Sequence, residues 1–448
     1  MKRRTFLKAS CAASCAGLFP GALWFSHNAM ASGGQSPVLV YLFLRGGIDG
    51  LHLVVPFAGP ERIAYERARV NDRVNLAIDE SRLRPITSEW ALHPRMGGEK
   101  GDSTDLSGKW LHRRFVQREL AIIQSVGIST VVNRSHFDAQ GFWDLGTPGS
   151  LGTNTGWLTR YLELQDSLPP ATFASAFGLA TRAQSVLRGS LQALLVNNPA
   201  DFRLGFNSFW SLDNPDIEGH QGAASRLFPL WAGQDMDHLA YGQRTVEAIH
   251  ALGEVDFSGY QPSGGADYPN MLLGNQLKDL AQLIKLDSGL VAATLNYGGW
   301  DNHSRIGMPD PGNPGHTDPY GDRVEGLSRA LDAFYTDLEN APGNLMNRVI
   351  VAVVSEFGRR VRPNMSAGTD HGYGNMMMLM GGGVKGGLHG RFTGLDSNSL
   401  AQGRDLDVST DYRQVLAEAM VARGNVPSRS LGQVFPEMDS YTPLGLFT

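Results

Sequence analysis

Asp301 and His303 are the first residues whose type and spacing could do chemistry. They lie two residues apart, just after a short, mostly apolar run at residues 290–296. In extended backbone, side chains two residues apart point to the same side. A carboxylate beside an imidazole suits a divalent ion such as zinc or manganese. The pair therefore predicts a metal site, although a lone Asp-x-His also arises by chance in solvated loops.

A second group of the same kind follows residues 349–354, a run of uncharged β-branched and small residues. Such a run predicts a strand buried on both faces, as in the middle of a parallel sheet. Glu356 follows it directly, and Asp370 and His371 follow after a loop with Pro and Gly. Ligands of open α/β sheets bind outside the carboxyl ends of the strands. We therefore interpret both groups as parts of one metal or anion site, with an ordinary solvated loop as the alternative.

Asp49 follows the clearest first strand, the apolar run at residues 38–44. The intervening Gly46 and Gly47 permit a tight turn and a close approach of backbone to a ligand. Asp49 would then lie on the same edge of the sheet as the two groups above. A turn aspartate before Gly50 is an equally good interpretation.

Ser135 lies where a loop turns into a helix, and it has two interpretations. As an N-cap it would accept a hydrogen bond from the first helical turn, with Asp138 three residues on as a variant of the capping box. As a hydroxyl at a helix N-terminus near a metal it would be an activated nucleophile. The neighbouring Arg134 and His136 are candidates for binding an anion.

The predicted strands and helices that carry these residues alternate along the chain. This order predicts an α/β fold with a mostly parallel central sheet and helices on both faces. Further strands are predicted at residues 120–126 and 375–380, and helices at 60–71, 111–118, 268–285, 319–338 and 410–423. The order strand, loop, helix, strand from residue 290 to residue 354 is a βαβ crossover.

Residues 169–286 carry few strand signals and are rich in Gly, Ser, Asn and Pro. We interpret them as a helical and irregular insertion or cap over the edge of the sheet. The Gly- and Pro-rich stretch 305–318 is predicted to be a mobile loop beside the site. His389 is a further candidate ligand, with an exposed loop histidine as the alternative.

Residues 1–31 match a twin-arginine export signal, with Arg3 and Arg4 before a moderately apolar stretch and a small-residue cleavage site at Ala31. Both cysteines, Cys11 and Cys15, fall inside it, so residues 32–448 can form no disulfide. We expect the twin-arginine translocase as a partner during export and a periplasmic or secreted protein without a stable membrane anchor. The net charge of −5 and the lack of a basic tract argue against nucleic acid as a partner.

Five segments together resemble an exported bacterial family, usually described as a domain of unknown function, of the alkaline phosphatase and sulfatase superfamily. The segments are LFLRGGIDGLHLVVP from Leu42, RSHFDAQGFWDLG from Arg134, GGWDNH from Gly298, SEFGR from Ser355 and GTDHGYG from Gly368. The resemblance implies an alkaline-phosphatase-like fold with two metal ions at the strand ends. It places one metal on Asp301, His303 and His371.

The resemblance places the other metal on Asp49, on Ser135 as nucleophile, and on an acidic residue with a following histidine. Here that pair is Glu356 and Phe357, and phenylalanine cannot bind a metal. Asp370 or His389 is a candidate substitute.

The function expected from the resemblance is metal-dependent hydrolysis of phosphate or sulfate esters. One or two ions of zinc, manganese, calcium or magnesium would act with Ser135 on a small anionic ester or glycan. Arg45, Arg134 and Arg359 would neutralise charge on the transferred group. The alternative is a catalytically degenerate relative that acts as a periplasmic binding or interaction protein.

Overall fold

The computed structural model describes residues 36–98, 108–165, 174–199, 245, 248, 251–307, 318–438 and 440–448. All of them belong to one compact unit, Ser36–Thr448. The expected export signal at residues 1–31 lies outside the described residues, as do most of the loop at 305–318 and the greater part of 200–250. In the described part of the chain, no helix has the length and apolar character needed to cross a membrane.

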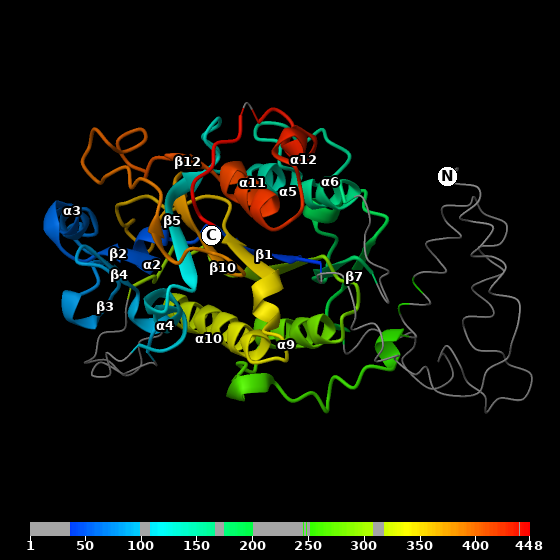
Figure 1. The fold of residues 1–448 in the computed structure, drawn as a ribbon. Coiled ribbons are helices and arrows are strands. Elements are labelled where there is room, and N and C mark those ends of the chain that lie inside the picture. The colour runs from blue at the N-terminus through cyan, green and yellow to red at the C-terminus, as the bar shows by residue number, and fades with distance from the viewer. Residues whose placement is uncertain are drawn as a thin grey trace, which may run out of the picture. The chain divides into compact units, whose positions relative to one another are not determined.

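The expected α/β fold is confirmed by a mostly parallel sheet with nine strands in the described residues (Figure 1). Its strands, in spatial order, are β11 (Gly387–His389), β5 (Leu120–Gly127), β10 (Asn375–Gly381), β9 (Val349–Val354), β1 (Val38–Arg45), β8 (Ala292–Gly298), β6 (Ala176–Leu179) and β7 (Ala193–Val196), with β12 (Thr410–Asp411) also paired to β5. Only β10 runs antiparallel to its two neighbours among these described strands. The carboxyl ends of β1, β8 and β9 therefore meet at one edge, where the sequence placed its candidate residues.

Helices cover both faces of the sheet, as predicted. The helices are α2 (Gly50–Leu53), α3 (Gly59–Ala68), α4 (Trp110–Val116), α5 (His136–Leu145), α6 (Trp157–Glu163), α9 (Leu272–Lys285), α10 (Pro319–Glu339), α11 (Tyr412–Ala422) and α12 (Leu431–Val434). Alternate residues of β1 point to opposite faces. Val40 packs in a core with α9 and α10, and Tyr41 packs in the other core with α5, α6 and α11. Figure 1 shows α9 and α10 on one side of the sheet and α5, α6, α11 and α12 on the other.

Smaller elements complete the fold. A three-stranded antiparallel sheet contains β2 (Val54–Pro56), β4 (Trp90–Leu92) and β3 (Arg84–Pro85). Short 3₁₀ turns cover η2 (Glu80–Arg82), η3 (Pro94–Met96), η4 (Ser185–Leu187), η7 (Ser263–Gly265), η8 (Leu345–Arg348) and η9 (Ser428–Ser430).

The region expected to be an insertion or cap differs from the expectation where it is described. β6 and β7 extend the central sheet beyond β8, and α9 packs against α10 beneath it. The two strands have four residues each, too short for their apolar runs to stand out in a Gly- and Ser-rich segment. β6 and β7 are therefore part of the sheet itself, and they are joined by an irregular segment that contains η4 (Ser185–Leu187).

Candidate metal centre

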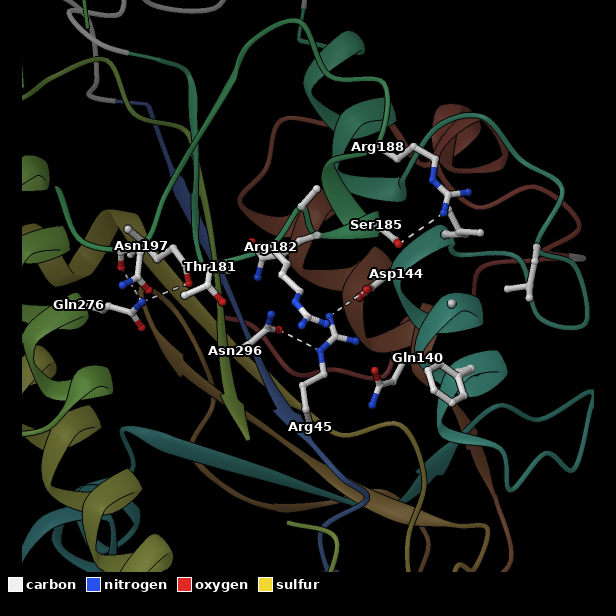
Figure 2. Close-up of a pocket in the computed structure, with 18 of the residues that line it drawn as sticks. Arg45, Gln140, Asp144, Thr181, Arg182, Ser185, Arg188, Asn197, Gln276 and Asn296 are labelled. Carbon is white, nitrogen blue, oxygen red and sulfur yellow. Dashed lines mark hydrogen bonds and ion pairs between the residues drawn. The ribbon is translucent and has the colours of Figure 1, made fainter. Parts of the chain in front are cut away.

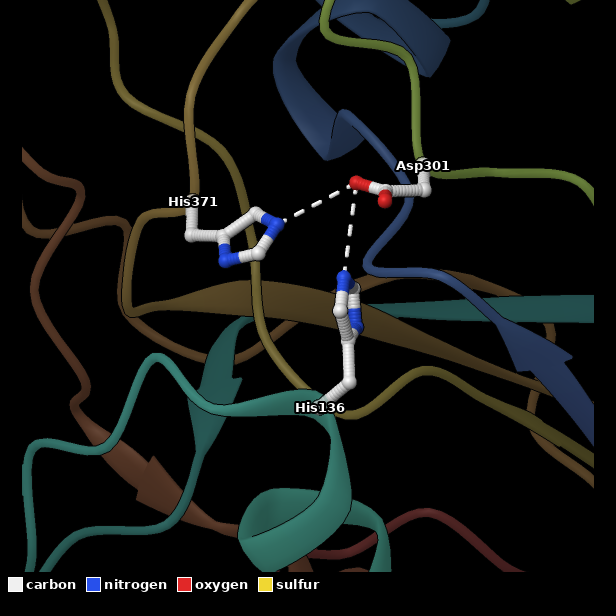
Figure 3. Close-up of side chains that lie close together, drawn as sticks. All are labelled: His136, Asp301 and His371. Carbon is white, nitrogen blue, oxygen red and sulfur yellow. Dashed lines mark hydrogen bonds and ion pairs between the residues drawn. The ribbon is translucent and has the colours of Figure 1, made fainter.

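Three side chains from distant segments converge at the edge where β1, β8 and β9 end. Asp301 follows β8, His371 lies in the loop between β9 and β10, and His136 is the first residue of α5. One ligand atom from each lies within 4.8 Å of those of the other two (Figure 3). Figure 3 shows both imidazoles directed at the same carboxylate oxygen.

His303 brings a fourth donor to the same point. Its Nε2 lies 2.9 Å from Nε2 of His371 and 3.1 Å from Oδ1 of Asp301. Nε2 of His371 lies 3.1 Å from that oxygen, and Nε2 of His136 lies 3.4 Å from it. We call His136, Asp301, His303 and His371 the histidine cluster. The predicted meeting of Asp301 with His303 is thus observed, but in a tight turn in which the His303 N–H donates to the Asp301 carbonyl.

Each imidazole of the histidine cluster is held from behind by an acceptor at Nδ1. His136 donates to Glu356 Oε1 over 2.9 Å, and His303 donates to Asp370 Oδ1 over 3.2 Å. His371 donates to the backbone carbonyl of Arg134 over 2.8 Å. Acceptors in this position fix the ring orientation and keep the proton on Nδ1, as they do behind metal-ligating histidines. The three Nε2 lone pairs therefore all point at the centre of the cluster.

This arrangement has an electrostatic consequence. Lone pairs of neutral imidazoles that face one another and a carboxylate oxygen repel, unless a proton or another cation lies between them. The hydrogen bond to Glu356 raises the pKa of His136, whereas burial lowers the pKa of His371. Burial also acts to raise the pKa of Asp301, but the hydrogen bond and charge of Arg359 outweigh it and lower that pKa to about 2. The carboxylate is therefore ionised and, together with the three Nε2 atoms, offers a set of donors that a cation can use.

Arg359 holds the segments that carry the cluster and does not face a substrate. Its side chain is fully buried and donates 2.6 Å to Asp301 Oδ1 and 2.9 Å to the Thr369 carbonyl. It also donates to the carbonyls of Gly46, Gly47 and Trp300. The expectation that Arg359 neutralises a transferred group is therefore corrected: it is a clamp between three loops.

Gly46 allows these loops to meet. Its φ is +123°, and a Cβ there would lie 2.5 Å from the backbone nitrogen of Asp301. A side chain would thus collide with backbone that cannot swing away, so the glycine is required by the close approach of the β1 and β8 loops.

Asp49, predicted as a metal ligand, lies outside the histidine cluster. Arg69 donates to both of its oxygens, over 2.8 and 2.6 Å, and the Thr369 hydroxyl donates over 3.1 Å. Asp49 is 2% exposed and also caps α2 through the His52 N–H. Burial acts to raise the pKa of Asp49, but the charge and hydrogen bonds of Arg69 outweigh it and lower that pKa. Asp49 is therefore corrected to a structural carboxylate that already has its cation.

Glu356 and Asp370 are also corrected from ligands to positioning residues. Glu356 Oε1 accepts from the Gly46 N–H and from Gln140 Nε2, each over 2.8 Å, in addition to His136. Asp370 Oδ1 accepts from Asn364 as well as from His303. Their oxygens lie on the far side of the rings from the cluster centre, because they bind Nδ1 while Nε2 faces inward.

The remaining candidates are placed as follows. Arg134 pairs with the buried Asp405, and only its carbonyl reaches the cluster. Arg45 donates to Asp144 and Asn296 in a neighbouring pocket. Ser135 is exposed at the N-cap of α5, where its Oγ accepts from the Asp138 N–H at 3.5 Å, as the capping interpretation predicted.

Neither His389 nor Phe357 belongs to the histidine cluster, which agrees with the loop-histidine alternative for His389 and with the chemistry of phenylalanine. His389 Nε2 donates to the carbonyl of Lys385, four residues before it in the chain, so it does not substitute as a ligand. Phe357 packs against the rings of both His136 and His371, with centroids 4.9 Å apart in each case, and supports them as an apolar wall. His136 was considered only for anion binding, because its partners Asp301 and Glu356 are distant in sequence.

The acceptors behind the rings yield a first prediction. Replacing Asp370 by asparagine should weaken metal binding by about 10–100-fold, because the oriented carboxylate behind His303 loses its charge. Competition with a fluorescent zinc chelator would measure it. Asp396→Asn is the matched control, since that exposed carboxylate accepts only from its own turn. Equal affinities of Asp370→Asn and wild type would mean that Asp370 does not orient a ligand.

Comparison with known proteins supplies one family match. Residues 276–421 match a family described as a protein of unknown function (DUF1501). A comparison with curated proteins finds no significant match. The matched segment contains Asp301, His303 and His371, and it confirms for that segment the resemblance to a domain of unknown function.

Solved structures give weaker likenesses. The C-terminal periplasmic domain of EcEptC from Escherichia coli, in complex with Zn, has 10% identity and a TM-score of 0.34, covering 92% of this chain and 89% of that one. The same domain without Zn in its description has 11% identity and a TM-score of 0.36 over the same shares of both chains. Ps i-CgsB in complex with k-i-k-neocarrahexaose has 10% identity and a TM-score of 0.34, over 91% of this chain and 75% of that one. Likenesses at this level do not determine an activity, and the similarity to DUF1501 is limited to residues 276–421.

Proposed function

We propose that this protein is an exported metal-dependent hydrolase of phosphate or sulfate esters, with one divalent ion held by the histidine cluster. The observation that carries the proposal is the convergence of three Nε2 atoms on Asp301 Oδ1, each imidazole fixed at Nδ1 by an acceptor. Three imidazoles and one carboxylate form a donor set that suits zinc best.

The residues fit both a metal and a substrate that approaches from solvent. The Asp301 side chain is 48% exposed and the His303 side chain 46%. A divalent ion in this position supplies Lewis-acid polarisation of a phosphoryl or sulfuryl oxygen. His136 and His371, only 25% and 23% exposed, hold the inner side of the site against Phe357.

Ser135 is the candidate nucleophile of this reaction. It is exposed, precedes the ligand His136 directly, and lies at the N-terminus of α5, where the helix dipole favours developing negative charge. Its hydroxyl oxygen would attack the phosphorus or sulfur atom as the bond to the ester oxygen breaks, and its proton would go to the leaving alcohol. Water would then cleave the ester formed on Ser135 and release phosphate or sulfate.

A catalytically degenerate binding protein is the second candidate, and a specific observation favours it. The residues that the resemblance assigns to a second metal are not assembled, since Asp49 is neutralised by Arg69 and Phe357 replaces a ligand. In that case the protein would hold one metal ion in a structural or binding role and would not hydrolyse esters.

Metal content and turnover together test the proposal. Elemental analysis of protein purified from its native compartment should find about one divalent ion per chain. Aryl phosphate or aryl sulfate should be hydrolysed, and a chelator should stop the hydrolysis. Bound metal with neither ester turned over would favour the binding protein, and a metal-free folded protein would contradict the hydrolase and also favour the binding protein.

Ser135→Asn separates the two roles of Ser135. Asparagine caps a helix as well as serine does, so the free energy of unfolding should change little. The nucleophile is lost, so kcat should fall at least about a hundredfold. Ser135→Ala should lose the activity and also about 1 kcal/mol of stability. Full turnover by Ser135→Asn would remove Ser135 from the mechanism.

A further inference from the structure

A pocket of about 520 Å³ lies beside the histidine cluster. His136 of the cluster is the first residue of α5, and residues from the next turns of the same helix line the pocket. Gln140 lines it, and Gln140 Nε2 donates to the same Glu356 oxygen that His136 does. Residues 136 and 140 are one helical turn apart, about 6 Å along the axis. The pocket and the cluster are therefore neighbours, and a molecule bound in one can reach the other.

Buried polar atoms without partners line this pocket. They are Oδ1 of Asp144, both amide atoms of Gln184 and Oε1 of Gln276, which lack a hydrogen-bond partner among the described residues. The three residues are 4%, 5% and 2% exposed, respectively. Polar atoms buried in this way cost free energy until something pairs with them. The lining also includes Thr181 and Asn197, which are exposed and can pair with the hydroxyl groups of a ligand.

The pocket is also positively charged, although the chain as a whole carries −5. Arg45, Arg182 and Arg188 line it, and Asp144 is its one acidic residue among the described lining residues. Figure 2 shows Arg45 and Arg182 directed into the middle of the pocket. Arg182 has no ion-pair partner within the described chain, and Arg188 contacts only the Thr153 carbonyl and the Ser185 hydroxyl there. Guanidinium groups that have no carboxylate partner bind carboxylate, phosphate or sulfate.

Phe137 adds an apolar surface at the same place. It lines the pocket, follows the ligand His136 directly, and is 90% exposed. A phenyl ring so exposed offers a flat apolar face to a ligand in the pocket. A sugar ring offers such a face, with hydroxyl groups around its edge.

From these features we infer that the pocket binds an anionic saccharide, which supplies hydroxyl groups to the exposed polar side chains of the lining, an acidic group to the arginines and a ring face to Phe137. The inference rests on the proposed function in one respect: the pocket holds the part of the ester that does not react. The ligand then carries two acidic groups: the ester that reacts at the histidine cluster, and a separate group that Arg182 recognises in the pocket.

Calorimetric titration of the full protein tests this. The probes are glucuronate, glucose 6-phosphate and glucose 6-sulfate, which distinguish the three acidic groups, with glucose and inorganic phosphate and sulfate as references. At least one charged sugar should bind about tenfold or more tightly than all references. Arg182→Ala and Phe137→Ala should each weaken it by about tenfold, and Arg73→Ala, which removes an exposed arginine outside the pocket, should not. Binding of glucose or of an inorganic anion as tight as that of the sugar acids, or no effect of Arg182→Ala, would overturn the inference.

The His371→Ala variant separates this inference from the proposed function. It lacks a proposed metal ligand but keeps the pocket, so it should bind the charged sugar as the wild type does while hydrolysis is lost. Sugar binding without any ester hydrolysis by the wild type would remove the hydrolase and leave the pocket. Hydrolysis of an aryl ester by the wild type without binding of any of the charged sugars would remove the pocket and leave the hydrolase.

Discussion

Replacing His371 by alanine is expected to release the divalent ion and to lower ester hydrolysis by at least about a thousandfold. His371 Nε2 lies within 3.1 Å of both His303 Nε2 and Asp301 Oδ1, so it is central to the proposed ligand set. Without it, the remaining donors lose the geometry that holds the ion. The rate of hydrolysis should then fall by as much as it does when a catalytic group is removed from an enzyme. Elemental analysis and turnover of aryl phosphate and aryl sulfate would measure both effects.

His389→Ala is the matched control for that experiment. It also removes a histidine, but one whose Nε2 donates to the nearby carbonyl of Lys385, so metal content and turnover should stay at the wild-type values. Urea unfolding would verify that both variants are folded. Wild-type metal content in folded His371→Ala would contradict the proposed centre.

The second large effect is expected in stability, from Arg69→Met. Arg69 is fully buried and is paired at two points with Asp49, which is 2% exposed. Removing one partner of a buried pair leaves an unpaired buried charge, and the free energy of unfolding should fall by about 3–5 kcal/mol. The midpoint of urea unfolding at neutral pH would measure this loss. Arg67→Met, which changes an exposed arginine of the same helix, should alter stability by less than about 0.5 kcal/mol.

The pH dependence of this loss has a defined sign. In the wild type the pKa of Asp49 is lowered, so the stability it contributes is present above its unfolded pKa and is lost as the pH falls through the folded pKa. In Arg69→Met, burial alone would raise that pKa, so Asp49 would take up a proton at higher pH than in the unfolded chain. The deficit should therefore shrink as the pH falls from neutral towards 4. A deficit that does not change with pH would mean that Asp49 is not the source of the loss.

The sequence determined the framework because framework signals are local. The continuous apolar runs of β1 and β9 matched the structure to within a residue, since a strand buried on both faces needs no polar position. The Asp318 cap and Pro319 fixed the start of α10 through contacts within one turn. The α/β fold class and the edge of the sheet at which the candidate residues gather follow from such signals.

Only the tertiary structure decided what each candidate residue does at that edge. Sequence spacing placed Asp49, Glu356 and Asp370 beside a metal, but it could not show that Arg69 neutralises Asp49 or that the other two bind Nδ1 of histidines. Nor could it assign His136, whose partner Glu356 is 220 positions away. A carboxylate acts as ligand, counter-ion or orienting acceptor according to which atom faces it, and that is set by contacts between segments that are brought together only when the sheet forms.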